Sequence, residues 1–246
     1  MIQLAIISDI HGNLLALEAV LKDISDRSID QIYCLGDLVD FAPWGNEVID
    51  RIRAHRIPCL LGNHDERIAY DLPIIPLAHH DAIETANREI AINWSKQTIR
   101  ADNKQWLAAL PYNITLTYKS GSSIKNILLV HATLESNDAY MYRDDSKNEL
   151  IAVLKERSVD VLVMGHTHQS YIQEQSDILF VNSGSVGRSR EDDRKATYTI
   201  LQIAETGIDA EIVKLNYAID EVASAIYKSD IPNFYGDFLL KKAALV

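Results

Sequence analysis

Short apolar runs alternate with segments of helical periodicity over the first part of the chain. Residues 3–8 (QLAIIS) form a continuous apolar run, which predicts a buried strand. Residues 13–27 predict a helix, because one of its faces is apolar at helical spacing. The positions on that face are Leu14, Leu17, Val20, Leu21 and Ile24.

The alternation continues after this helix. Residues 31–35 (QIYCL) and 57–61 (IPCLL) predict two further buried strands. Residues 46–55 between them predict a short helix with Asn46 as its N-cap. An order of strand, helix, strand, helix and strand predicts a parallel sheet with right-handed crossovers.

The middle of the chain, from about residue 66 to residue 110, has no strand pattern. Its periodicity predicts two or three helices, of which residues 82–97 (AIETANREIAINWSKQ) are the clearest. We expect a small helical insertion over one edge of the domain. Trp94 and Trp106 stand at helical positions, where they would pack the insertion or line a pocket that stacks a base.

Alternation with a period of two returns in the second half. Residues 112–119 (YNITLTYK) place Ile114, Leu116 and Tyr118 on one face of a strand, and residues 120–126 predict a turn. The other predicted strands are 127–130, 159–165, a hairpin over 170–182 turning near Ser176–Asp177, and a hairpin over 196–215 turning at 205–207.

Two helices complete the pattern. Residues 146–157 carry a capping box, Ser146 and Glu149, before an apolar helical face, and residues 219–229 form the second amphipathic segment. The predicted fold is α/β (α+β): a sandwich of two β-sheets flanked by helices. We predict one domain, residues 1–246, with the helical insertion at about 66–110.

Composition narrows the class of protein. Hydrophobic residues make up 47% of the chain, enough for a sizeable core, and no apolar run reaches the length of a transmembrane helix. The first residues lack the basic segment and cleavage site of a signal peptide, so we expect a cytoplasmic protein. The net charge of −11 argues against binding to a nucleic-acid duplex or a membrane, although metal ions would still permit a phosphate substrate.

The two cysteines, Cys34 and Cys59, both lie in apolar runs. Buried free thiols in a reducing compartment are the simplest interpretation. A disulfide or a metal-binding role is the alternative.

Candidate chemistry stands where the apolar runs end. Strand ends of an α/β sheet gather ligand sites, and glycines at positions 12, 36, 62 and 165 permit tight turns there. The polar residues that follow the runs are Asp9, His11, Asp37, Asn63, His64, His131, His166 and His168.

Without His64, these residues offer two Asp, one Asn and four His, and no thiolate. Such nitrogen and oxygen donors suit Mn, Fe, Zn, Ni or Co rather than a structural zinc. Seven ligands exceed one tetrahedral ion but make two sites if one carboxylate bridges. Two metals about 3.5–4 Å apart can clamp a phosphoryl group.

Five segments, SDIHGN, GDLVD, GNHDE, VHA and GHTH, occur in an order and spacing that resembles the calcineurin-like metallophosphoesterases. The resemblance covers Met1 to about Tyr198. Further segments, including WLAALP and VNSGSVGRSREDDRKATY, resemble the bacterial branch of small phosphodiesterases and diadenosine-tetraphosphatase-like proteins. The fold that the resemblance implies is a four-layer αββα arrangement of two sheets between helices.

The resemblance also implies roles for individual residues. The first of two divalent transition-metal ions, most often Mn²⁺, is held by Asp9, His11, Asp37 and His168. The second is held by Asp37, Asn63, His131 and His166, with Asp37 as the bridge. A hydroxide between the metals attacks phosphorus. His64 does not bind metal but contacts a phosphate oxygen or protonates the leaving group.

One position departs from the family pattern. Many members carry an arginine soon after the second motif's Asp, but Phe41 stands there in this chain. The candidates to replace its charge are Arg67, Arg143 and Arg188. Asp40 is a candidate catalytic residue that orients His64; its alternative is a solvated turn carboxylate.

Two other segments carry open alternatives. Residues 184–187 (GSVG) favour a turn that supports the metal loops over a phosphate cradle, because they lack P-loop spacing. His79 and His80, in the insertion, favour exposed surface over contact with a substrate or partner.

The function that these observations favour is hydrolysis of a small-molecule phosphate ester, either a phosphodiester or a dinucleoside polyphosphate. A serine/threonine protein phosphatase is less favoured, because the arginine is missing and the insertion is small. A non-catalytic scaffold on the same fold, as in the retromer subunit, is a third hypothesis. The insertion and residues 231–240 (IPNFYGDFLL) offer surfaces for a homo-oligomer.

Overall fold

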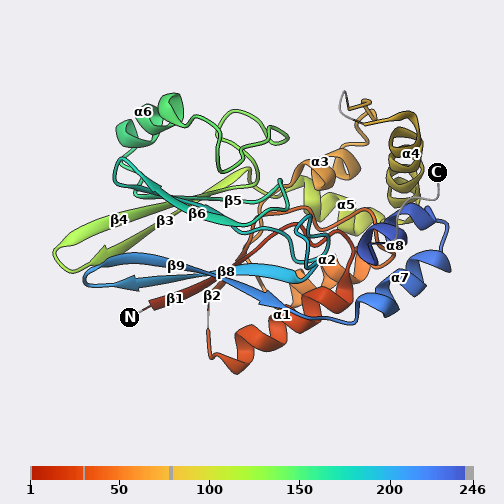
Figure 1. Ribbon diagram of the computed structural model, residues 1–246, viewed down its shortest axis with the longest axis horizontal. Helices are drawn as coiled ribbons and strands as arrows, with labels where there is room; N and C mark the ends of the chain where they lie inside the picture. The colour runs from red at the N-terminus through yellow and green to blue at the C-terminus, as the bar shows by residue number, and fades with distance from the viewer. Residues whose placement is uncertain (1, 30, 78–79, 242–246) are drawn as a thin grey trace.

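Two β-sheets packed face to face form the centre of the molecule (Figure 1). The computed structural model describes residues 2–29, 31–77 and 80–241. The first sheet has the strand order β2-β1-β8-β9. Its strands are β1 (Ile2–Ile7), β2 (Gln31–Cys34), β8 (Ala196–Ala204) and β9 (Gly207–Leu215). β1 and β2 are parallel, whereas β8 is antiparallel to both β1 and β9, so the sheet is mixed.

The second sheet has the order β3-β4-β5-β7-β6 and is also mixed. Its strands are β3 (Asn113–Ser120), β4 (Ser123–Val130), β5 (Val161–Met164), β6 (Tyr171–Gln175) and β7 (Ile178–Asn182). β4, β5 and β7 are parallel, and hairpins add β3 and β6 at the two edges. The two predicted hairpins, 170–182 and 196–215, are confirmed.

Strand β1 is apolar without alternation because both of its faces are buried. Leu4 and Ile6 pack between the sheets, with Leu129 and Val163 of the second sheet. Ala5 and Ile7, and the other residues that point the opposite way, pack under the outer helices. A strand buried on both faces needs apolar side chains at every position.

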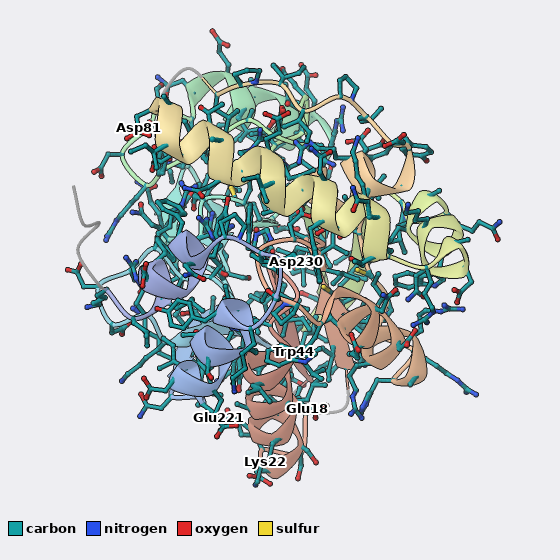
Figure 2. All side chains as sticks on the ribbon, turned by 90° about the vertical axis from the view of Figure 1, so that its right-hand side faces the viewer. Glu18, Lys22, Trp44, Asp81, Glu221 and Asp230 are labelled. Atoms are coloured by element: carbon teal, nitrogen blue, oxygen red, sulfur yellow. The ribbon has the colours of Figure 1, made fainter. Side chains whose placement is uncertain are left out.

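Helices cover both outer faces and one end of the sandwich, as predicted (Figure 1). α1 (Leu14–Asp26) and α2 (Gly45–Ala54) cover the first sheet, and α6 (Asn148–Glu156) covers the second. Five helices gather at one end: α3 (Asn63–Ala69), α4 (Ala82–Thr98), α5 (Ala101–Ala108), α7 (Ile219–Tyr227) and α8 (Asn233–Leu239). In Figure 2, which faces this end, α4 starts beside the label Asp81 and crosses above α7 and α8.

Besides the turn predicted over residues 120–126, where β4 already begins at Ser123, three local predictions were wrong. Residues 57–61 form a single bridge, Cys34 to Cys59, and no strand, since Pro58 has no N–H for a ladder. Asn46 does not cap α2, because the helix begins at Gly45 and Trp44 is at its N-cap position. The Asn46 side chain instead bonds the backbone of Thr98 and Arg100, at the junction of α4 and α5.

The third wrong prediction is the capping box of Ser146 and Glu149. α6 begins at Asn148, after Lys147, and has no side-chain cap. The buried ammonium of Lys147 donates instead to three carbonyls of the loop before the helix.

Other predictions concern single side chains. Trp94 and Trp106 pack against the apolar clusters beneath the insertion, which favours the packing interpretation. Cys34 and Cys59 are buried free thiols. Within the described residues, no helix has the length and apolar character needed to cross a membrane.

Candidate metal centre

Strand ends from both sheets bring the candidate ligands to one place. Asp9 follows β1 and Asp37 follows β2; His131 follows β4 and His166 follows β5. Each of these strand pairs is parallel, so its ends lie at the same edge. The backbone N–H of His166 donates to Asp9 Oδ2 at 2.9 Å, which links the two sheets at this edge.

The loops that carry these side chains have unusual backbone conformations. Seven non-glycine residues of the site have positive φ angles, a region that costs roughly 1–3 kcal/mol when it is strained. They are Asp9, His11, Asp37, Asp40, Phe41, His166 and His168. Such a concentration in one place is typical of a functional site, where the fold maintains unfavourable backbone geometry.

Two glycines allow these loops to touch. A Cβ atom at Gly62 would lie 2.2 Å from both the backbone N and Oδ1 of Asp37. A Cβ atom at Gly165 would lie 2.4 Å from Asp9 Oδ2. Both positions therefore exclude any side chain, and the loops approach through bare backbone.

The first cluster consists of Asp9, His11 and His168, all buried. His11 Nε2 and His168 Nε2 are 3.1 Å apart, and His168 Nε2 is 3.1 Å from Asp9 Oδ1. His11 Nδ1 donates to the Val39 carbonyl at 2.9 Å, and His168 Nδ1 donates to the Arg188 carbonyl at 2.8 Å. In the neutral rings, both Nε2 atoms therefore carry no proton, and their lone pairs face each other.

The second cluster consists of Asp37, His131 and His166, again buried. His131 Nε2 lies 3.4 Å from Asp37 Oδ2 and 3.1 Å from Asn63 Oδ1, while its Nδ1 donates to the Leu35 carbonyl at 3.0 Å. Asp37 Oδ2 is also 3.7 Å from His11 Nε2 of the first cluster. Asp37 thus stands between the two clusters.

Both clusters fit a cation. Three of their atoms are buried and make no hydrogen bond within the described residues: Asp9 Oδ1, Asp37 Oδ2 and His166 Nε2. Buried acceptors that face one another are costly unless a proton or a metal ion lies between them. Burial alone would lower the pKa of His131, but the charge of Asp37 outweighs it and raises that pKa to about 10. The cluster therefore favours a positive charge at His131 Nε2, where a metal can replace the proton.

Residues 184–187 support these loops. Ser185 Oγ donates to the Asp9 carbonyl at 2.7 Å, and Gly187 N donates to the same oxygen at 3.1 Å. The segment therefore holds the backbone of Asp9 in the first cluster, which favours the interpretation as a supporting turn.

His64 stands beside the clusters, and its ring is paired with Asp40. Its Nδ1 lies 2.5 Å from Asp40 Oδ2, and its backbone N–H donates to Asp37 Oδ1 at 2.8 Å. Asp40 is fully buried, and burial raises its pKa to about 6. The alternative of a solvated turn carboxylate at Asp40 was therefore wrong. Burial also lowers the pKa of His64.

A cavity of about 260 Å³ opens over the clusters. Asp37, Asn63, His64, His166 and His168 line it. Its cationic side chains are Arg67, Arg88, Arg188 and Arg190. Two of the three arginines predicted to replace the missing charge are therefore here. The third, Arg143, is exposed and lies outside the lining.

Several residues of the cavity were not predicted. Tyr140 lies against the ring of candidate ligand His166, with centroids 4.4 Å apart. Phe234, Tyr235 and Phe238 reach the cavity from α8, a helix that the sequence pattern did not predict. His80 also lines the cavity, which favours contact with a substrate over exposed surface, and His79 lies outside the described residues.

Asp65 is a further residue whose role was missed, although it belongs to the quoted GNHDE segment. Its carboxylate accepts from the backbone N–H groups of Leu38 and Gly62, at 2.8 and 3.3 Å. It therefore ties the Asp37 loop to the Asn63 loop. The signal was its position one residue after His64 in the quoted motif.

Comparison with known proteins gives one family and consistent structures. The model of the calcineurin-like phosphoesterase superfamily domain matches residues 2–206. An uncharacterised protein of Methanocaldococcus jannaschii is 30% identical over 258 aligned residues, with 96% of each chain covered.

Two solved structures share the fold. A hypothetical protein of Pyrococcus horikoshii has a TM-score of 0.81 at 19% identity, covering 97% of this chain and 98% of that one. A metallophosphoesterase of Sphaerobacter thermophilus has a TM-score of 0.71 at 23% identity, covering 98% and 99%. The similarity therefore extends beyond the matched domain to nearly the whole chain.

Proposed function

Because this chain belongs to the calcineurin-like phosphoesterase superfamily, we propose that it hydrolyses a small-molecule phosphodiester or dinucleoside polyphosphate at a dinuclear metal centre. The family makes it a metal-dependent phosphoester hydrolase. The proposal adds the class of substrate and the residues that act on it.

One observation carries the proposal: two buried clusters of metal-ligand side chains meet at Asp37 beneath a cavity with four arginines. Asp9, His11, Asp37 and His168 would hold one divalent transition-metal ion, and Asp37, Asn63, His131 and His166 the other, with Mn²⁺ favoured. When bound, such ions neutralise phosphoryl charge and lower the pKa of water. The arginines bind the anionic substrate above them.

His64 and Asp40 act together at the phosphate group of the substrate. Asp40 accepts from Nδ1 of His64, which directs Nε2 to the cavity that both clusters share. A phosphate anion near Nε2 favours the protonated ring, which can then contact a phosphate oxygen or protonate the leaving oxygen. Asp40 is a positioning residue for His64 in this scheme.

The preference for a substrate with two groups on phosphorus rests on a second cleft. A cleft of about 660 Å³ adjoins the metal cavity and shares Asn63, Arg67, Leu77, Arg88 and Asp138 with it. Its outer walls combine apolar residues, such as Leu72 and Ile75, with polar residues 135–138. A second substituent or a nucleoside fits there, whereas a simple monoester would leave it unused.

The alternative of a non-catalytic scaffold has less support. A protein that only binds partners has no physical reason to keep seven polar ligand groups buried together.

The proposal treats the chain as one domain, because the insertion at about 66–110 and helix α8 line the same cavity. It also places the enzyme in the cytoplasm, consistent with two buried free thiols.

The test compares bis-p-nitrophenyl phosphate with p-nitrophenyl phosphate, using metal-stripped protein with and without added Mn²⁺. We expect Mn²⁺-dependent hydrolysis of the diester that exceeds hydrolysis of the monoester. Turnover of the monoester alone would contradict the diester preference. No turnover of either ester and no bound metal would contradict the hydrolase and favour the scaffold.

A further inference from the structure

The guanidinium of Arg188 is held by aromatic rings at the wall of the metal cavity. Its Cζ atom lies 4.5 Å from the ring centroid of Phe41, 4.6 Å from that of Phe238 and 5.5 Å from that of Tyr235. Phe41 belongs to the loop after β2, and the other two rings belong to α8. Side chains from opposite ends of the chain therefore fix one cation in place.

Among the residues that the structure describes, this cation has no anionic partner. Within the described residues, no hydrogen bond or ion pair involves its guanidinium, and its Nε is buried without an acceptor. Burial, and then the nearby charge of Arg190, lowers the pKa of Arg188 to about 10, so the group is still charged at neutral pH. A partly buried, unpaired charge is costly, and the aromatic rings offset only part of that cost.

Arg188 also differs from two of the other three arginines of the cavity, Arg67 and Arg88. Arg67 Nη1 lies 3.5 Å from the ring nitrogen of His64, and Arg88 Nη1 donates to the Ile75 carbonyl at 3.0 Å. Arg88 therefore has a hydrogen-bond acceptor in the absence of substrate, and Arg67 lies against the His64 ring. Arg188 is oriented by ring contacts alone, which leave its N–H groups available.

The backbone of the same residue supports the metal centre. The Arg188 carbonyl accepts a hydrogen bond from Nδ1 of His168. The Arg188 side chain lines the cavity together with Asp37 and His64. An anion bound over the clusters therefore lies next to the guanidinium. The ring contacts hold the side chain in place beforehand, so little conformational entropy is lost on binding.

We propose that Arg188 binds a phosphate oxygen of the substrate, with Phe41, Tyr235 and Phe238 as the clamp that aims its guanidinium. This assignment rests on the proposed phosphoesterase function. The planar fork of an arginine can give two parallel N–H bonds to one phosphate, a geometry that a lysine cannot reproduce. Helix α8 thereby contributes to substrate binding, although it lies beyond the residues that the family model matches.

The test measures binding of inorganic phosphate to the Mn²⁺-loaded protein by titration calorimetry, so that it does not depend on turnover. For Arg188→Met we expect the Kd for phosphate to rise roughly 10- to 100-fold, the loss usual for charge-assisted hydrogen bonds, with Mn²⁺ content unchanged. Arg188→Lys keeps the charge and the stem, and we expect its Kd to lie between the two.

Arg194→Met is the matched control. Its Cζ also lies over the Phe238 ring, at 4.1 Å, but Arg194 does not line the cavity. We expect this variant to bind phosphate like the wild type. A Kd for Arg188→Met within about threefold of wild type would overturn the assignment, as would an Arg188→Lys variant that binds as tightly as wild type.

The outcomes also separate this inference from the proposed function. Phosphate binding that depends on Arg188, in a protein that hydrolyses neither nitrophenyl ester, would keep Arg188 as an anion site and contradict the proposed diester activity. Diester hydrolysis with phosphate binding unaffected by Arg188→Met would contradict only the role of Arg188.

Discussion

His64 has a neighbour of each charge: the carboxylate of Asp40 on its Nδ1, and Arg67 within 3.5 Å of the same atom. The ring is 12% exposed, so water does little to orient it. Its direction is therefore set by Asp40, and a change at either residue should affect the same step.

We predict that His64→Ala lowers kcat about 10²–10⁴-fold, the usual range for loss of general acid–base catalysis, while metal content is unchanged. Asp40→Asn should cause part of the same loss, because its amide can still contact the ring but no longer fixes the tautomer. Steady-state kinetics and metal analysis on the same samples provide the measurement. If His64→Ala loses metal, the residue is a ligand and its assigned role is wrong.

The loop before α6 shows how a single buried charge can position an element. Lys147 is 1% exposed, and its Nζ donates to the carbonyls of Tyr142, Arg143 and Asp145. Tyr142 stacks on Tyr140, with ring centroids 5.7 Å apart, and Tyr140 in turn lies against His166. The contacts of Lys147 therefore extend to the metal cavity.

We predict that Lys147→Met lowers the free energy of unfolding by about 1–3 kcal/mol, because three carbonyls of the loop lose the donor that the buried Lys147 side chain supplies. Urea denaturation monitored by circular dichroism gives the value. Lys155→Met, in the exposed last turn of α6, is the control and should change it by less than about 0.5 kcal/mol. Equal midpoints for the two variants would mean that the loop holds its shape without Lys147.

At the scale of the whole molecule, the metal centre lies where the two sheets meet. Asp9 and Asp37 extend from the first sheet, and His131 and His166 extend from the second. Ions held by both sets would tie the sheets together. A ligand that binds only the folded state adds to its stability by mass action.

We predict that Mn²⁺ at about 100 times its Kd stabilises the folded protein by about 2.7 kcal/mol. In a chain of this size, such a gain raises the thermal midpoint by roughly 5–10 °C, which scanning calorimetry can measure. Asp37→Asn should abolish most of this effect, because Asp37 would serve both ions. Asp26→Asn removes an exposed carboxylate far from the clusters and should keep it. A full Mn²⁺ effect in Asp37→Asn would contradict the bridging assignment.

The sequence by itself determined the layers of the fold and the polar residues that follow its strands, and the family resemblance implied their division between two ions. Apolar runs such as residues 3–8 have to be buried, and parallel strands have to end at one edge, so the polar residues after them have to converge. The helical face of residues 13–27 and the two hairpins follow from equally local patterns. The motif series then supplied the family, which the comparison confirmed.

Only the tertiary structure decided the contacts between segments that are distant in the sequence. Asn46 and Ser146 have the sequence of helix caps, but Asn46 serves the α4–α5 junction, and α6 begins without a side-chain cap. The place of Arg188 depends on Phe41 and on α8, which no local pattern relates to each other. Hydrophobic periodicity records which face of a segment is buried, whereas a hydrogen bond or a ring contact depends on which other segment arrives there.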